Sequence, residues 1–147
     1  MTAARTSRVL FVCVGNSCRS QMAEGFARAL GGGRIVPFSA GSRPEGLVNP
    51  VAVRLMAERG IDLAGHWSKG LGELPQGEAW DILVTMGCGD ACPHLPARRR
   101  LDWSIPDPWG VDDEEFRAVR DRIEAEVRTL IAHSAAPGSE PVPNSSS

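Results

Sequence analysis

The chain has 147 residues, of which 42% are hydrophobic and 23% are charged, and its formal net charge is −2 at pH 7. This composition is ordinary for a single globular domain and excludes wholesale disorder. The near balance of charges argues against a protein that binds nucleic acid through a strong positive field. No apolar run approaches the roughly 20 residues that span a bilayer, so we expect no membrane association and a cytoplasmic location.

The first half of the chain predicts alternating strands and helices. An apolar, β-branched run over residues 8–13 predicts a strand that is buried on both faces. Apolar residues at helical spacing over 20–30 predict a helix, which the glycines at 31–33 end. Residues 34–39 predict a second strand, and Pro37 places this strand at an edge of the sheet.

The second half continues the alternation. A helix is predicted over 50–59, followed by a less regular, glycine-rich stretch with one short helix near 68–74. A third, buried strand is predicted over 81–86 and a fourth strand over 101–105. The longest helix is predicted over 112–133, where an acidic first turn suits the positive end of the helix dipole.

This order of elements indicates an α/β fold: a three-layer sandwich with a central four-stranded parallel sheet and helices on both faces. We expect one domain over residues 8–133, with flexible tails over 1–7 and 134–147. In such folds the ligand site lies beyond the carboxyl ends of the strands.

The motif that carries most chemistry begins where the first predicted strand ends. Cys13 is followed by a short loop and by Arg19 at the start of a helix, so the backbone N–H groups of the loop can converge on one anion. The Arg19 guanidinium can bind two oxygens of a tetrahedral oxyanion, and the same positive field favours the thiolate of Cys13. We therefore expect an oxyanion pocket with a built-in nucleophile rather than a buried cysteine before an ordinary turn. The expected oxyanion-binding residues are Val14, Gly15, Asn16, Ser17, Cys18, Arg19 and Ser20.

Other residues at the same end of the predicted sheet suggest further steps. Asp107, before a proline, could donate a proton to a leaving oxygen, although an Asp-Pro pair alone is usually a turn. Cys88 and Cys92 follow the third predicted strand and suggest thiol–disulfide exchange. They could instead be inert loop residues. A zinc site is not favoured, because these thiols and His94 make three ligands without a fourth nearby.

The run CVGNSCRSQMAE, from Cys13 to Glu24, resembles the active-site loop of the low-molecular-weight protein tyrosine phosphatase superfamily. Its second half is more similar to the arsenate reductase branch, because the phosphatases usually have Pro at the position of Gln21. The resemblance extends from about Val9 to Ile131. It implies a flavodoxin-like sheet topology and an enzyme without a cofactor. It also implies a monomer that binds arsenate, with phosphate or sulfate as analogues in the loop.

The resemblance further implies a disulfide relay for arsenic detoxification. Cys13 attacks arsenate while Asp107 assists loss of a hydroxyl, and Cys88 then attacks Cys13 and releases arsenite. Cys92 attacks Cys88, and thioredoxin reduces the resulting disulfide; mycothiol and glutaredoxin are alternative reductants. The alternative function is a low-molecular-weight protein tyrosine phosphatase in which Cys88 and Cys92 are incidental.

The chain departs from the thioredoxin-coupled pattern in the spacing of its cysteines. Only three residues separate Cys88 from Cys92, fewer than in that pattern, which also places the first relay cysteine at the position of Gly87. Two cysteines four positions apart on an intact helix are poorly oriented for a disulfide. The loop must therefore be irregular or unwind on oxidation.

Some arsenate reductases of this type bind potassium beside the loop, through residues that match Asn16, Glu24 and Ser39 and one acidic residue. This chain has Lys69 at the place of the acidic residue. We hypothesise that the chain binds no metal there and that the Lys69 ammonium replaces potassium and pairs with Glu24. The alternative is that Lys69 is a solvated surface residue.

Overall fold

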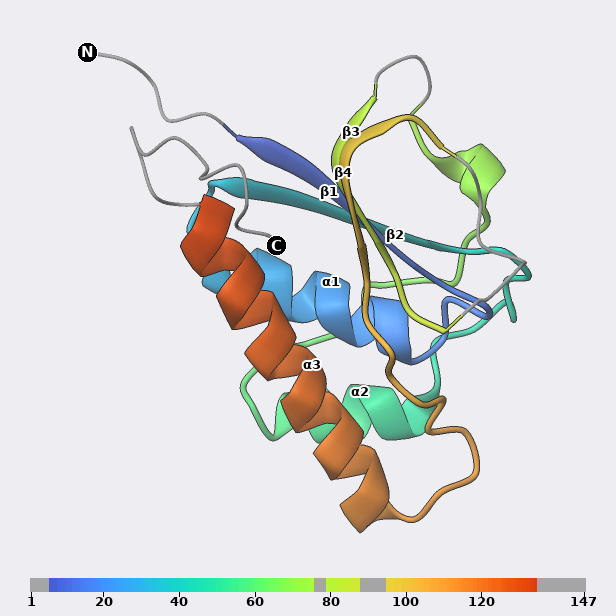
Figure 1. Cartoon of the computed structure of the whole chain (residues 1–147). Coiled ribbons are helices and arrows are strands. Elements are labelled where there is room, and N and C mark those ends of the chain that lie inside the picture. Colours follow the sequence, from blue (N-terminus) through green and yellow to red (C-terminus); the bar gives the residue numbers. More distant parts are fainter. Residues whose placement is uncertain (1–5, 76–78, 88–94, 135–147) are drawn as a thin grey trace.

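A computed structural model of the chain describes residues 6–75, 79–87 and 95–134. Cys88, Cys92 and His94 lie outside the described residues, as do residues 1–5 and 135–147 of the predicted tails. The elements in chain order are β1 (Ser7–Cys13), α1 (Arg19–Leu30), β2 (Ile35–Gly41), α2 (Pro50–Ala57), the 3-10 helix η1 (Leu71–Glu73), β3 (Trp80–Thr85), β4 (Ala97–Asp102) and α3 (Asp113–Ser134) (Figure 1).

The strands form one parallel sheet in the order β2-β1-β3-β4. The predicted α/β class, the four-stranded parallel sheet and the flavodoxin-like order are therefore confirmed. β2 lies at an edge of the sheet, as Pro37 predicted. β1 starts at Ser7 and α3 ends at Ser134, each one residue beyond the expected limits of the domain.

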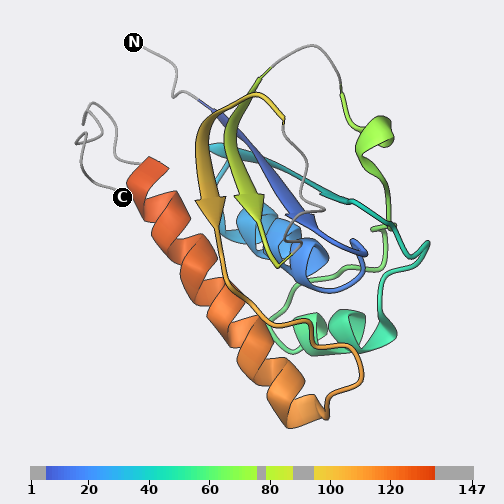
Figure 2. The ribbon, with the colours of Figure 1, turned by 45° about the vertical axis from the view of Figure 1, so that its right-hand side comes forward.

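The two faces of the sheet are covered differently (Figures 1 and 2). Val9 and Phe11 of β1 point into a large apolar cluster with α1, α2 and α3. Leu10 and Val12 point to the opposite face, where they pack in a smaller cluster with Leu74. In the described part of the chain, this second layer contains η1 and its neighbours rather than an α-helix. β1 is thus buried on both faces of the sheet, as its continuous apolar run predicts.

The position of β4 corrects one prediction. We expected this strand over 101–105, but it spans Ala97–Asp102, with Arg99 opposite Ile82 and Leu101 opposite Val84 of β3. A strand at the edge of a sheet tolerates exposed charged side chains, so three consecutive arginines can form it. The apolar residues after Asp102 are buried in the core without strand pairing, and the apolar pattern alone therefore placed the strand too late.

None of the helices in the described part of the chain combines the length and apolar character needed to cross a bilayer.

Candidate active site

The oxyanion loop, which we define as residues 13–19, connects the carboxyl end of β1 to the first turn of α1. Cys13 is 2% exposed and Arg19 is 5% exposed, although the residues between them form no regular structure. Asn16 has a φ of 50°, a left-handed conformation that Asn tolerates better than most residues. The loop thus bends sharply back toward the helix axis.

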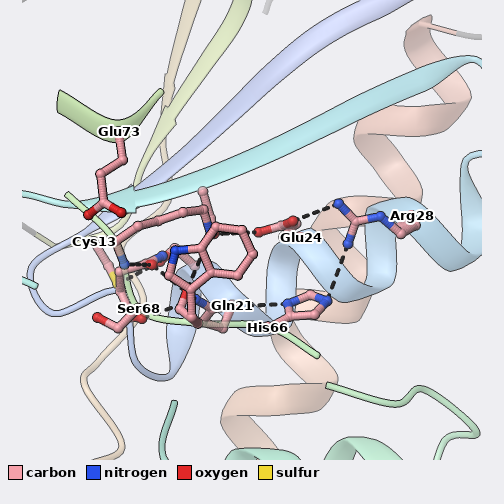
Figure 3. A network of polar contacts seen from close by, with 12 residues as sticks. Cys13, Gln21, Glu24, Arg28, His66, Ser68 and Glu73 are labelled. Atoms are coloured by element: carbon pink, nitrogen blue, oxygen red, sulfur yellow. Dashed lines mark hydrogen bonds and ion pairs between the residues drawn. The ribbon is translucent and has the colours of Figure 1, made fainter. Parts of the chain in front are cut away.

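A directed chain of hydrogen bonds runs from Asn16 to the sulfur of Cys13 (Figure 3). The backbone N–H of Lys69 donates to Asn16 Oδ1 at 2.8 Å, which identifies the other end of that side chain as its nitrogen. This nitrogen donates to Ser20 Oγ at 2.8 Å. The Ser20 hydroxyl hydrogen is then available to Cys13 Sγ, which lies 3.0 Å away. A donor aimed at the sulfur stabilises a thiolate.

Gln21 holds this chain in place and was missed as a site residue by the sequence analysis. Its side chain is fully buried, and its amide nitrogen donates to Asn16 Oδ1 at 2.9 Å and to the carbonyl oxygen of Trp67 at 2.8 Å. A third, longer contact of 3.2 Å joins it to the carbonyl oxygen of Asn16. Gln21 therefore ties the first turn of α1 to the oxyanion loop and to the segment before Lys69. A polar residue on the buried face of a helix was the available signal.

The same geometry fixes the protonation of His66. Gln21 Oε1 lies 2.9 Å from His66 Nδ1 and can only accept, so Nδ1 carries the hydrogen. His66 Nε2 lies 3.3 Å from the Arg28 guanidinium, which can only donate, so Nε2 is an acceptor and the ring is neutral. Burial lowers the pKa of His66. The negative charge of Glu24 raises it, whereas the positive charges of Arg28 and Lys69 lower it further.

Arg19 lines the pocket, and not every N–H group of its guanidinium has a hydrogen-bond partner among the described residues. Nη1 donates to the carbonyl oxygens of Met86 at 2.9 Å and Ile105 at 3.1 Å, while Nη2 lies 3.7 Å from Asp107 Oδ2. Nε is buried and has no hydrogen-bond partner among the described residues. Gly87 has a φ of 77° and packs so closely on Arg19 Nη1 that a Cβ at this position would clash with it. Gly87, which directly precedes Cys88 in the sequence, thus packs against Arg19 of the site.

The pocket above the loop is small, about 40 Å³. Asp107 stands at its mouth with a half-exposed side chain, and its Oδ1 accepts from the backbone N–H of Trp109 at 3.1 Å. Glu45, which the sequence analysis did not single out, also lines the pocket. The residues around it are Cys13, Val14, Gly15, Ser17, Cys18, Arg19, Glu45, Asp107 and Trp109. The pocket can accept a small tetrahedral oxyanion against a thiol, with a carboxyl group nearby for proton transfer.

A buried charge cluster supports the loop from the side of β2. Lys69 Nζ lies 3.6 Å from Glu24 Oε1 and 3.2 Å from Ser39 Oγ, which itself donates to Glu24. Arg28 donates to the other carboxylate oxygen of Glu24 at 2.6 Å. Burial opposes ionisation of Glu24, but the hydrogen bonds from Ser39 and Arg28 and the charge of Lys69 outweigh it and hold the pKa of Glu24 below its usual range.

Cys18 is the second cysteine of the loop. Burial raises the pKa of Cys18 to about 12, and the charges of Asp107 and Cys13 act in the same direction. A group with this pKa stays a thiol near neutral pH, and a thiol is a poor nucleophile.

The structure therefore brings Cys13, Arg19 and Asp107 to one pocket, which Val14, Gly15, Ser17 and Cys18 of the expected oxyanion-binding residues also line. Asn16 and Ser20 do not line the pocket and instead support Cys13 through hydrogen bonds. Lys69, Glu24, Ser39 and Asn16 come together beside the pocket, while the two distal cysteines are not among the described residues.

Comparison with known proteins identifies the family of the chain. A family model described as low molecular weight phosphotyrosine protein phosphatase matches residues 8–137. A glutaredoxin arsenate reductase of Synechocystis sp. is 41% identical over 128 residues, which cover 85% of this chain and 96% of that protein. Arsenate reductase 1 of Staphylococcus epidermidis is 44% identical over 129 residues, which cover 83% of this chain and 93% of that protein.

Solved structures agree with this relationship. An arsenate reductase in its phosphate-binding state has a TM-score of 0.77 at 39% identity, with 86% of this chain and 98% of that chain covered. A thioredoxin-dependent arsenate reductase of Corynebacterium glutamicum has a TM-score of 0.71 at 31% identity, with 90% of this chain and 64% of that chain covered. The chain therefore belongs to the arsenate reductase branch of the low-molecular-weight phosphotyrosine protein phosphatase family.

Proposed function

We propose that this protein is an arsenate reductase that converts arsenate to arsenite in the pocket above residues 13–19. The observation that carries the proposal is the pairing of a buried Cys13 with an Arg19 whose Nε has no partner in the described structure, in a chain about 40% identical to arsenate reductases. The backbone N–H groups of the loop and Arg19 bind the oxyanion. Ser20 stabilises the Cys13 thiolate by donating to its sulfur.

The first step is nucleophilic. The Cys13 thiolate attacks As(V), an As–S bond forms, and one arsenate oxygen leaves as water after it receives a proton from Asp107. Asp107 suits this role because its carboxyl group is half-exposed at the mouth of the pocket, where it can exchange its proton with solvent.

The second step transfers electrons. The Cys88 thiolate attacks Cys13 Sγ, the As–S bond breaks with its electron pair on arsenic, and arsenite leaves as As(III). The packing of Gly87 against Arg19 Nη1 supports this step, because Gly87 directly precedes Cys88 in the sequence. Cys92 then attacks Cys88, which frees the Cys13 thiolate and leaves a disulfide between Cys88 and Cys92.

The reductant of that disulfide is proposed to be thioredoxin. The Corynebacterium glutamicum relative is a thioredoxin-dependent arsenate reductase, which supports this choice. Glutaredoxin is the second candidate, because the Synechocystis relative is a glutaredoxin arsenate reductase. We also propose that the protein works as a monomer, which sedimentation equilibrium tests.

The alternative, a low-molecular-weight protein tyrosine phosphatase, rests on the same pocket and on the family match. An aryl phosphate ester needs aromatic side chains around its ring. Among the residues that the structure describes, Trp109 is the one aromatic residue that lines the pocket, and the chain contains no Tyr. We therefore expect weak phosphatase activity from the shared oxyanion loop and not an efficient tyrosine phosphatase.

The test is NADPH oxidation in the presence of arsenate with either thioredoxin and its reductase or glutaredoxin with glutathione and its reductase. Wild type is compared with Cys13→Ser, Cys88→Ser and Cys92→Ser. Cys18→Ala is the matched control, because only the backbone N–H of Cys18 is proposed to face the oxyanion. Loss of turnover in the three serine variants, with turnover kept in Cys18→Ala, supports the relay. Wild-type inactivity with both reductants, together with efficient hydrolysis of para-nitrophenyl phosphate, favours the phosphatase.

A further inference from the structure

The segment after β2 is fixed beside the oxyanion loop even though it is exposed. The backbone N–H of Arg43 donates to the Val14 carbonyl oxygen at 2.8 Å, and that of Glu45 donates to the Gly15 carbonyl oxygen at 2.9 Å. Ser68 bridges the two segments, because its hydroxyl donates to the Gly15 carbonyl oxygen at 3.0 Å and accepts from the Gly46 N–H at 3.1 Å. The backbone of Glu45 is therefore held in register with the loop that binds the oxyanion.

The side chain of Glu45 lies on the loop because Gly15 leaves room for it. A Cβ at Gly15 would stand 2.6 Å from Glu45 Cγ and 3.1 Å from its Oε2. The side chain lines the pocket together with Cys13 and Arg19. Among the residues that the structure describes, nothing donates a hydrogen bond to the Glu45 carboxylate and no cation pairs with it. An acceptor thus faces a pocket whose other binding groups are mainly N–H donors.

A hydrogen-bond acceptor in an oxyanion pocket distinguishes ligands by whether one of their oxygens carries a hydrogen. The loop N–H groups and Arg19 donate to any tetrahedral oxyanion, whereas a carboxylate can approach only an oxygen that carries a hydrogen. Arsenate and phosphate keep at least one proton near neutral pH, but sulfate keeps none. A sulfate oxygen beside Glu45 would meet like charge and could make no hydrogen bond with it.

We propose that Glu45 is a specificity-determining residue that favours protonated tetrahedral oxyanions over sulfate. This inference rests on the proposed function, because it names the class of oxyanion that the reductase pocket accepts. Glu45 accepts the O–H of hydrogen arsenate, whereas sulfate has no hydrogen to donate to this carboxylate. The enzyme thereby takes arsenate in a cell that contains sulfate.

Protection of Cys13 from alkylation tests the proposal without any arsenate reduction. The protein is treated with iodoacetamide at pH 7 and constant ionic strength in increasing phosphate or sulfate, and modified Cys13 is measured by peptide mass spectrometry. In wild type, half-protection by sulfate should need more anion than half-protection by phosphate, by up to about fivefold, the upper range for one partly solvated charge. In Glu45→Gln the two concentrations should approach each other.

Glu126→Gln is the matched control, because it removes the same charge from the groove between β4 and α3, away from the pocket. It should keep the wild-type ratio. An unchanged ratio in Glu45→Gln, equal protection by both anions in wild type, or protection by neither overturns the proposal. Because the assay requires no turnover, a protein that fails to reduce arsenate but keeps the Glu45-dependent ratio would overturn only the proposed function.

Discussion

The ammonium of Lys69 and the carboxylate of Glu24 lie 3.6 Å apart, and about nine-tenths of each side chain is buried. The backbone N–H of Lys69 also donates to the side chain of Asn16, the central residue of the oxyanion loop. One residue thus supplies a positive charge beside Glu24 and a hydrogen bond to the loop, in the region where related enzymes are expected to bind potassium.

Activity should therefore not depend on potassium. The arsenate reductase rate of the wild type should be the same, within error, in potassium chloride and in sodium chloride at equal ionic strength. Lys69→Ala should be slower in sodium and recover part of its rate in potassium, because a cation can then occupy the vacated space beside Glu24. Arg98→Ala, which removes an exposed cation from β4, is the control. A strong potassium requirement in wild type would contradict the hypothesis.

Acid should destabilise the protein partly through Glu24. The pKa of Glu24 is held below its ordinary value of 4.5, so the unfolded chain takes up this proton at a higher pH than the folded chain. The resulting stability is complete above about pH 4.5 and is lost as the pH falls through the folded pKa. The midpoint of urea unfolding should fall with pH in this range.

In Glu24→Gln the dependence on pH should be weaker than in wild type. This variant should also be less stable at pH 7, by about 3 kcal/mol, because Lys69 keeps a buried charge without its carboxylate partner. Glu114→Gln, an exposed site on α3, controls for the loss of one carboxyl group. Parallel pH profiles for Glu24→Gln and wild type would refute this assignment.

Gln21 should be essential to the shape of the oxyanion loop. Gln21→Leu introduces an apolar side chain of similar size and leaves Asn16 Oδ1 and the carbonyl oxygen of Trp67 without this donor. The expected cost is about 2 kcal/mol of unfolding free energy, with weaker phosphate binding. Urea unfolding and phosphate protection of Cys13 measure the two effects. Wild-type values for both would show that Gln21 only fills space.

Asp107 should accelerate formation of the covalent arsenic adduct. Asp107→Asn keeps the size of the side chain but cannot donate the proton, so the single-turnover rate should fall by about 100-fold. Asp102→Asn is the control, since Asp102 is the last residue of β4 and accepts from Thr85 rather than lining the pocket. Rapid-quench measurement of arsenite separates the two variants. A rate within about twofold of wild type would exclude Asp107 as the general acid.

Much of the fold could be predicted because the relevant patterns are local. The continuous apolar run of β1 and the proline in β2 predicted a buried central strand and an edge strand. The limits of β4 could not be predicted in this way. Its arginines are stabilised as a strand by pairing with β3, a contact that local hydrophobicity does not report.

The residues of the site also differ in whether they could be predicted from the sequence. Cys13 and Arg19 lie within one continuous motif, so sequence reasoning could propose them together. Gln21, His66 and Glu45 act through contacts with distant segments, including the 2.9 Å contact between Gln21 and His66 across 45 positions. No short motif encodes such contacts. Their roles emerge only when the hydrogen bonds of the folded chain are followed one by one.

Counting thiols after a single turnover tests the central claim most directly. The fully reduced protein is mixed with arsenate in the absence of any reductant, and arsenite and the remaining thiols are measured together. Reduction of As(V) to As(III) takes two electrons, so the account predicts two thiols lost for each arsenite released, and neither change in Cys13→Ser. Phosphate in place of arsenate should leave every thiol intact. Arsenate that leaves all four cysteines reduced and yields no arsenite would contradict the account.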